Sequence, residues 1–185
     1  KRQTRYDIRQ GMKSDIKTTI YKEPSNKIIQ QFWEYYKSIA TEKKFRMYSE
    51  GKFKHEIFTL MKNGHADLFV YYYNGTIVNF SLASNFGIAS YLHGAINYKF
   101  KELKGCPSPG QLAQWEMMTK VKADVAKIYD MGFCPGPEPY KEHPSYNIWR
   151  FKYGFGGDHV QFLPVYGKAL KPLRGRIFKY MKYKK

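Results

Sequence analysis

Two runs of β-forming residues flank an Asn-Gly pair near the middle of the chain, and this pattern constrains the fold more than any other. Residues 66–73 (ADLFVYYY) and 76–82 (TIVNFSL) are rich in β-branched and aromatic side chains. Asn74 and Gly75 between them can both adopt positive φ, as a two-residue hairpin turn requires. Another run of strand-forming residues follows at 89–95. The sequence therefore predicts a meander of three antiparallel strands.

Helices and short strands are predicted on both sides of this meander. Apolar residues at helical spacing predict helices at residues 4–14, 25–43, 52–62, 111–126, 145–153 and 168–185. Short strands are predicted at residues 16–21, 127–130 and 160–165. Ser25 is a candidate N-cap for its helix. In the helix at 111–126 the predicted core stripe is Leu112, Trp115, Met118, Val121 and Val125.

This order of elements predicts an α/β chain, more narrowly α+β, in which helices flank a mixed and mostly antiparallel sheet. A length of 185 residues is enough for one domain with its own core, so residues 1–185 are expected to form a single domain. The order resembles the acyltransferase fold shared by the GNAT N-acetyltransferases. A fold by itself does not fix a reaction.

The charge of the chain points to a polyanionic partner. Lysine and arginine number 32 against 15 acidic residues, which gives a net charge of +17. The excess is uneven, because residues 168–185 contain eight basic residues and no acidic one. Nucleic acid, an anionic membrane surface and phosphorylated substrates all fit such a balance. The alternative is a lysine-rich surface that only serves solubility.

Several common sites are missing from the sequence. It contains no phosphate-binding P-loop and no G-x-S-x-G nucleophile elbow. Cys106 and Cys134 are too few for a zinc ribbon, and the histidines form no metal-binding motif, so no metal site is predicted. No apolar run reaches the length of a membrane span. The Q/R-x-x-G-x-G/A turn with which acetyltransferases bind coenzyme A is also absent.

Three motifs together carry a resemblance to a known family. They are Tyr91-Leu92-His93-Gly94-Ala95, the stretch 111–118 (QLAQWEMM) with Tyr129-Asp130-Met131-Gly132, and the stretch 150–157 (RFKYGFGG). In this order they resemble the Fem family of aminoacyl-tRNA-dependent peptidyltransferases, which build the interpeptide bridges of peptidoglycan. The stretch 2–9 (RQTRYDIR) is similar to the start of the second acyltransferase-like subdomain of that family.

The resemblance implies a function and a set of partners. A Fem-type enzyme moves an amino acid from aminoacyl-tRNA to an amine of the stem peptide of the peptidoglycan precursor, without coenzyme A or any other cofactor. The partners would be aminoacyl-tRNA and a UDP-linked or lipid-linked muropeptide. The expected location is the cytoplasm, with peripheral contact at the inner face of the membrane. The chain would be the C-terminal half of a two-subdomain architecture.

The resemblance also implies site residues. The F-K-x-G-F motif of the family falls on Phe151, Lys152, Gly154 and Phe155. Lys152 is the candidate cation, because attack of an amine on an ester carbonyl builds a negative oxygen that a fixed cation stabilises. Phe151 is expected to stack on the terminal adenine of tRNA or to pack against the lysine. The precursor-binding residues of the family are matched loosely by Arg2, Arg5 and Tyr6.

Departures from the family pattern leave alternatives open. Phe133 stands where the family has a second glycine, a proline-rich stretch occupies residues 134–144, and the first subdomain is absent. Asp130 has the alternative role of capping a strand or turn. The other candidate functions are a non-catalytic RNA-binding domain of the same fold and an N-acetyltransferase that uses acetyl-CoA. The transferred amino acid, the acceptor position, the activity of the isolated chain and its oligomeric state stay open.

Overall fold

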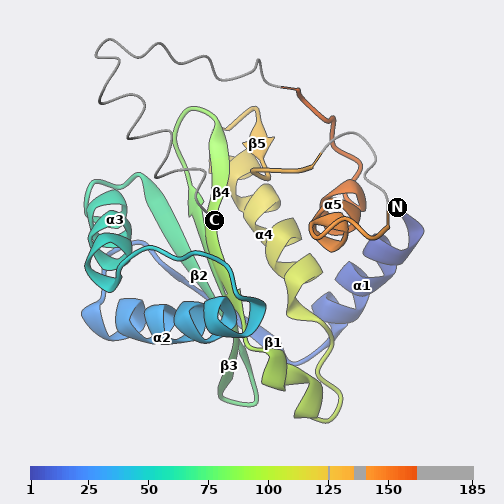
Figure 1. Ribbon diagram of the computed structural model, residues 1–185, viewed down its shortest axis with the longest axis horizontal. Coiled ribbons are helices and arrows are strands. Elements are labelled where there is room, and N and C mark those ends of the chain that lie inside the picture. The colour runs from blue at the N-terminus through green and yellow to red at the C-terminus, as the bar shows by residue number, and fades with distance from the viewer. Residues whose placement is uncertain (125, 136–140, 162–185) are drawn as a thin grey trace, which may run out of the picture.

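A five-stranded sheet forms the centre of the molecule (Figure 1). The computed structural model describes residues 1–124, 126–135 and 141–161. The strands lie in chain order, and every neighbouring pair is antiparallel except β4 and β5, which are parallel. The strands are β1 (Ile16–Tyr21), β2 (Ala66–Tyr73), β3 (Thr76–Ser84), β4 (Ala89–Ile96) and β5 (Tyr129–Asp130). The predicted α+β class with a mixed, mostly antiparallel sheet is confirmed.

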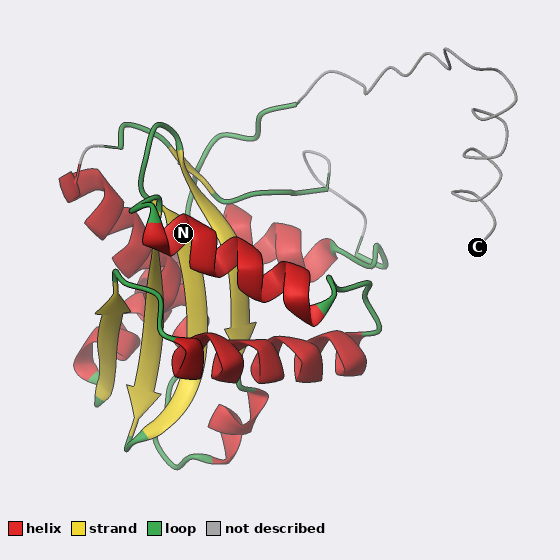
Figure 2. Cartoon of the chain, turned by 90° about the vertical axis from the view of Figure 1, so that its left-hand side faces the viewer, coloured by secondary structure: helices red, strands yellow, loops and turns green. Residues whose placement is uncertain are grey.

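Helices cover both faces of this sheet. The helices are α1 (Arg2–Lys13), α2 (Asn26–Lys43), α3 (Glu50–Lys62), the 3-10 helix η1 (Tyr98–Glu102), α4 (Pro109–Asp124) and α5 (Tyr146–Tyr153). Helices α2 and α3 lie across one face, which is turned toward the viewer in Figure 2. Helix α4 covers the other face, and α1 and α5 lie on its outer side (Figure 1). None of the helices in these described ranges is both long and apolar enough to cross a membrane.

The predicted hairpin forms at the predicted residues. Asn74 and Gly75 have φ angles of 48° and 77°, so both occupy the left-handed region that a tight hairpin turn needs. The strands that they join, β2 and β3, pair from Tyr73 and Thr76 back to Ala66 and Ser84, with one bulge. Because successive side chains of a strand point to opposite faces, β2 contributes to a core on each side of the sheet.

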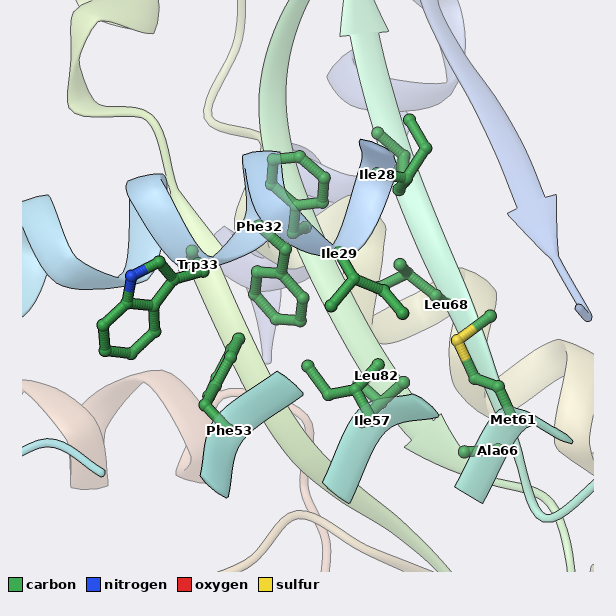
Figure 3. Packing of buried hydrophobic residues seen from close by; sticks show 13 residues of the cluster. Ile28, Ile29, Phe32, Trp33, Phe53, Ile57, Met61, Ala66, Leu68 and Leu82 are labelled. Carbon is green, nitrogen blue, oxygen red and sulfur yellow. The ribbon is translucent and has the colours of Figure 1, made fainter. Parts of the chain in front are cut away.

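The core between the sheet and helices α2 and α3 is built from aliphatic and aromatic side chains (Figure 3). At its centre Phe32 stacks on Phe80 and meets Phe53 edge-on, with ring centroids 5.1 Å apart in both pairs. The buried members are Ile28, Ile29, Phe32, Trp33, Phe53, Ile57, Met61, Ala66, Leu68, Val70, Phe80, Leu82 and Ala95.

The core on the opposite face mixes apolar side chains with tyrosines. Ala113 and Met117 of α4 pack there against Phe69, Tyr71 and Tyr73 of β2. Helix α1 then packs on the outer side of α4 by a close approach. A Cβ atom added at Gly11 would lie 2.9 Å from the Cβ of Leu112.

The prediction for Trp115 is wrong, because this side chain is 44% exposed. Helix α4 is buried between the sheet and α1, so its inner faces carry Leu112, Ala113, Met117 and Val121, and Trp115 lies outside them. Helix η1 lies in a segment for which the sequence predicts neither a helix nor a strand. Of the predicted strand at 160–165, residues 160 and 161 are not in a strand, and 162–165 lie outside the described residues. Val125 and the predicted helix at 168–185 also lie outside them.

Candidate acyl-transfer site

The Lys152 side chain joins α5 to the segment that follows β5. Its ammonium group donates hydrogen bonds to the carbonyl oxygens of Met131 at 2.5 Å and Phe133 at 2.7 Å. Burial lowers the pKa of Lys152 because it removes hydration from the charged form, whereas the neighbouring Cys134 and Asp130 act to raise it. An ammonium group has three donors, so these two carbonyls leave one donor for another acceptor.

A tight turn at Gly132 places those carbonyl groups. The Asp130 carboxylate accepts a hydrogen bond from the Gly132 N–H at 2.7 Å, so the expected alternative role of Asp130 as a turn cap is confirmed. Gly132 has a φ angle of +76°, which side-chain-bearing residues rarely adopt. A Cβ atom there would lie 3.6 Å from the Tyr91 carbonyl oxygen and 3.7 Å from the Lys152 nitrogen. The turn thus brings β4, the end of β5 and the lysine together.

Phe151 lies where β4 ends and α4 begins. A Cβ atom added at Gly110 would lie 3.3 Å from Ile96 and 3.5 Å from the ring of Phe151. The Phe151 ring meets Phe155 edge-on, with centroids 5.5 Å apart. Successive residues of α5 therefore reach different elements, since Phe151 contacts the start of α4 while Lys152 reaches the segment after β5. The expectation that Phe151 binds the tRNA adenine stays a prediction.

Gly154 allows α5 to approach α1 closely. Its φ angle of −57° is helical, and a Cβ atom there would lie only 2.2 Å from the Thr4 hydroxyl oxygen. Gly156, two residues later, has a φ angle of +80°. The structure therefore assigns a packing role to Gly154 and a turn role to Gly156. A substrate contact at Gly154 or Phe155 stays a prediction.

Arg2, Arg5 and Tyr6 lie together on the exposed side of α1. Their spacing of three and four residues puts them on one side of the helix. Ile8 and Gly11 are the buried residues of α1, and they face the molecule on the other side. The structure thus gathers Phe151, Lys152, Gly154 and Phe155 on or just after α5 and leaves the three α1 side chains facing solvent. Their role in precursor binding stays a prediction.

A polar group beneath the site was not assigned a role from the sequence. The Tyr129 hydroxyl of β5 donates a hydrogen bond to the side-chain oxygen of the buried Gln114 at 3.0 Å. Burial, with smaller contributions from Tyr91 and Asp130, raises the pKa of Tyr129. The Tyr91 ring lies over Gly94, where a Cβ atom would be 1.7 Å from the hydroxyl oxygen. These residues come from two of the three sequence motifs, and the order of those motifs in the chain was the only signal of a common site.

Two surface hollows of about 320 and 460 Å³ border α2, and neither is lined by a residue of α5 or β5. Within ranges 1–124, 126–135 and 141–161, no group of three or more histidine, cysteine, aspartate or glutamate side chains is placed to hold a metal ion. The assignment of the site therefore rests on the contacts of Lys152 and Phe151.

Sequence comparison places the chain in a family. The family model described as Acetyltransferase (GNAT) domain matches residues 2–142, more than half of the chain. The chain belongs to the GNAT acetyltransferase domain family. The residues matched by the family model end before α5, so Lys152 lies outside the matched range. A comparison with curated proteins gives no match.

Solved structures share the fold of this GNAT domain. The crystal structure of FemX matches with a TM-score of 0.71 and 17% identity, covering 84% of this chain and 54% of the FemX chain. A possible acetyltransferase from Clostridium difficile 630 matches with a TM-score of 0.58 and 10% identity over 83% of this chain and 98% of its own. A predicted acetyltransferase with acetyl-CoA from Clostridium acetobutylicum matches with a TM-score of 0.51 and 11% identity, over 82% and 96% of the two chains.

These likenesses establish the fold of an acyltransferase. The GNAT domain spans about half the length of the FemX chain that it matches, whereas it covers nearly all of the two clostridial acetyltransferases. Identities of 10–17% do not identify a substrate.

Proposed function

We propose that this GNAT domain transfers an amino acid from aminoacyl-tRNA to an amine of the peptidoglycan precursor stem peptide, as Fem-type enzymes do. The observation that carries this proposal is the position of Lys152. The ammonium group is half-buried and fixed by two main-chain carbonyls, inside the motif that resembles the F-K-x-G-F motif of the Fem family. The structural likeness to FemX supports the same assignment at the level of the fold.

The chemistry requires a cation of this kind. The acceptor amine attacks the carbonyl carbon of the aminoacyl ester, a C–N bond forms, and negative charge develops on the carbonyl oxygen. The third donor of the Lys152 ammonium stabilises this oxygen, and partial burial strengthens the interaction because less water screens it. The ester C–O bond then breaks, and the proton released by the amine reaches the ribose hydroxyl of the departing tRNA.

The charge of the chain supports tRNA as the donor. A net charge of +17 favours a polyanion. If the domain neutralises about six phosphates, the logarithm of the binding constant should fall with the logarithm of salt concentration with a slope of about −5. A lack of salt-sensitive tRNA binding would count against this proposal.

Two other functions are alternatives to this proposal. Acetyl-CoA-dependent N-acetylation is favoured by the family description and by the acetyl-CoA in the Clostridium acetobutylicum structure. The absence of the Q/R-x-x-G-x-G/A turn from the sequence argues against it. The other candidate, a non-catalytic RNA-binding domain, predicts tRNA binding without any transfer.

The deciding experiment measures transfer of a radiolabelled amino acid from total charged tRNA to a UDP-linked pentapeptide precursor. The variants are Lys152→Ala and, as a matched control, Lys54→Ala. Lys54 is also partly buried and also hydrogen-bonded, to Gln30 and Glu50, but it lies on α3 across the sheet. Loss of a fixed cation at a developing oxyanion should reduce kcat by about 10²–10³-fold.

We expect Lys152→Ala to lose transfer while the protein stays folded and tRNA binding stays unchanged, and Lys54→Ala to keep transfer. Equal activity of the two variants would remove Lys152 from the mechanism. Acetylation of amines by acetyl-CoA in a parallel assay would favour the acetyltransferase reading. Since the chain spans half of FemX, an inactive wild-type chain is retested within a longer two-subdomain protein.

A further inference from the structure

Three exposed apolar side chains gather at one end of the sheet. Phe86 and Ile88 lie in the β3–β4 turn, and Ile128 lies just before β5, with 53%, 57% and 58% of their surfaces exposed. We call these three residues the apolar tip. Isolated exposed apolar residues are ordinary, whereas a cluster of them marks an interaction surface.

The members of the apolar tip are neighbours in space. The Ala89 N–H donates a hydrogen bond to the Ile128 carbonyl at 3.1 Å, where β4 and β5 begin to pair in parallel. Ile88 and Ile128 immediately precede the paired residues Ala89 and Tyr129, so they lie side by side where two strands about 5 Å apart begin. The β3–β4 turn and β5 meet at the same end of the sheet in Figure 1.

Hydrogen bonds fix the turn that carries the apolar tip. The Ser84 hydroxyl accepts the N–H of Ser90 at 2.8 Å and so closes the base of the turn. The Asn85 N–H donates to the His65 carbonyl at 3.1 Å, and the Phe86 ring lies 4.7 Å from the His65 ring. The apolar side chains are therefore held outward on a fixed turn, so inserting them costs little ordering entropy.

Three lysines lie in the segments that adjoin the apolar tip. Lys62 ends α3 three residues before His65, Lys122 lies in the last turn of α4, and Lys127 adjoins Ile128. The described segments 62–65, 85–90 and 126–129 contain no acidic residue, and the exposed Asp130, which pairs with Ser90, lies at the same end of the sheet. Exposed apolar side chains with lysines in the adjoining segments fit an anionic lipid bilayer, whose headgroups attract lysine and whose acyl chains accept isoleucine and phenylalanine.

We propose that the apolar tip inserts into the surface of an anionic membrane and docks the domain there. A stable protein interface buries about 800 Å² on each partner, which is more than three side chains provide. Nucleic acid is a poorer fit, because two of the three side chains are aliphatic and cannot stack on bases as aromatic rings do.

Docking at this end would bring the candidate site close to the membrane. Met131, whose carbonyl holds Lys152, follows Ile128 by three residues, so their Cα atoms are at most about 11 Å apart. An amine acceptor carried on a lipid would then be delivered beside the lysine. This consequence rests on the proposed function, whereas membrane docking itself does not.

The test must separate insertion of the apolar tip from simple attraction to the basic residues at 168–185. A fluorophore is attached at Ile88→Cys, or at Met12→Cys as a control, in a Cys106→Ala/Cys134→Ala background. Met12 is similarly exposed, at 64%, but lies at the end of α1. The labelled proteins are mixed with phosphatidylcholine–phosphatidylglycerol vesicles whose acyl chains carry bromine, a contact quencher. We expect quenching at position 88 and none at position 12.

Binding of unlabelled variants to the same vesicles gives a second measurement. Ile88→Ser/Ile128→Ser should weaken binding by about tenfold or more, and Met12→Ser should leave it unchanged. Lys62→Gln/Lys127→Gln should weaken it by roughly fivefold for each lysine removed, and Lys13→Gln/Lys17→Gln by less. Vesicles of phosphatidylcholine alone should bind weakly.

Three outcomes would overturn membrane docking. Absence of quenching at position 88 would mean that any binding is peripheral attraction without insertion. Equal binding by the serine variant and wild type would mean the same. A change in sedimentation of the serine variant without lipid would show instead that the apolar tip contacts another copy of the chain. Transfer to the soluble UDP-linked acceptor is measured in parallel, so failure of docking and failure of the proposed function are distinguishable.

Discussion

The two faces of the sheet are packed with different chemistry. Against α2 and α3 the buried core consists of aliphatic and aromatic residues, with rings stacked at its centre and tyrosines only at its partly buried edge (Figure 3). Against α4, tyrosines take part and their hydroxyl groups make directed contacts. Tyr71 donates to the carbonyl of Ala113 at 3.3 Å, and Tyr73 donates to the carbonyl of Lys104 at 3.0 Å.

This difference separates stability from positioning. Apolar burial has no preferred direction. The α2–α3 face therefore adds to the free energy of unfolding but does not by itself fix the position of a helix on the sheet. Buried hydroxyl groups need a partner at a set distance and angle, so Tyr71 holds α4, and Tyr73 the segment before α4, at one place on the sheet. The candidate site, with Lys152 and Phe151, lies on the face where positions are fixed in this way.

The largest effect is expected on the apolar face. Phe32→Ala removes a fully buried ring and should cost about 3–5 kcal/mol in the free energy of unfolding. Phe58→Ala on α3, where the ring is 37% exposed, should cost less than about 1 kcal/mol. Urea unfolding measures both. If Phe32→Ala cost no more than Phe58→Ala, this face would not be the main source of stability.

A smaller effect is expected where α5 meets α1. Gly154→Ala places a methyl group against the Thr4 hydroxyl and should cost about 1–3 kcal/mol. Thr4→Ala removes the clashing oxygen, so the double variant should recover part of that loss. A double-mutant cycle with urea unfolding measures the coupling between the two positions. Additive losses would show that this contact does not limit the approach of the helices.

Gly132→Ala should affect the site more than the fold. A side chain at a φ angle of +76° costs about 1–2 kcal/mol, and the strain falls on the turn whose carbonyls hold Lys152. Gly156→Ala is the matched control, because its φ angle is +80° and a Cβ atom there meets nothing within 4 Å. We expect similar losses of stability but a fall in transfer activity only for Gly132→Ala. Equal activities would separate the turn from the reaction.

The smallest effect concerns a carboxyl group on the α4 face. Burial raises the pKa of Glu116 above its ordinary 4.5, although the Thr18 hydroxyl donates to it at 2.7 Å and partly opposes the shift. The folded state therefore favours the protonated carboxyl group. As pH rises from below 4.5 through the raised pKa, ionisation of Glu116 lowers the free energy of unfolding. Glu116→Gln should abolish that dependence and make the protein slightly more stable at neutral pH.

The matching control is Glu34→Gln, at an exposed position on α2. Urea unfolding of both variants and the wild type from acidic to neutral pH measures the difference. A Glu116→Gln variant that is less stable than wild type at neutral pH would show that the ionised carboxylate is favoured in the folded state.

The sequence predicted the elements because they depend on local interactions. The Asn-Gly turn, the apolar periodicities and the residue types of the strands each act over a few positions, and the observed bounds of β1 and β2 agree with them. The prediction for Trp115 failed because the burial of α4 is set by the sheet on one side and by α1, about a hundred residues earlier in the chain, on the other. The direction of a helix face is a tertiary property that periodicity alone does not give.

For the site, the sequence by itself determined the cationic motif and its residue types. Only the tertiary structure decided which groups surround them. Lys152 lies 19 and 21 residues from the two carbonyls that hold it, Gly154 packs against Thr4, and Tyr129 reaches Gln114. Such contacts form only when the sheet brings β4, β5, α1 and α5 together, because hydrogen bonds and close packing depend on distances in space.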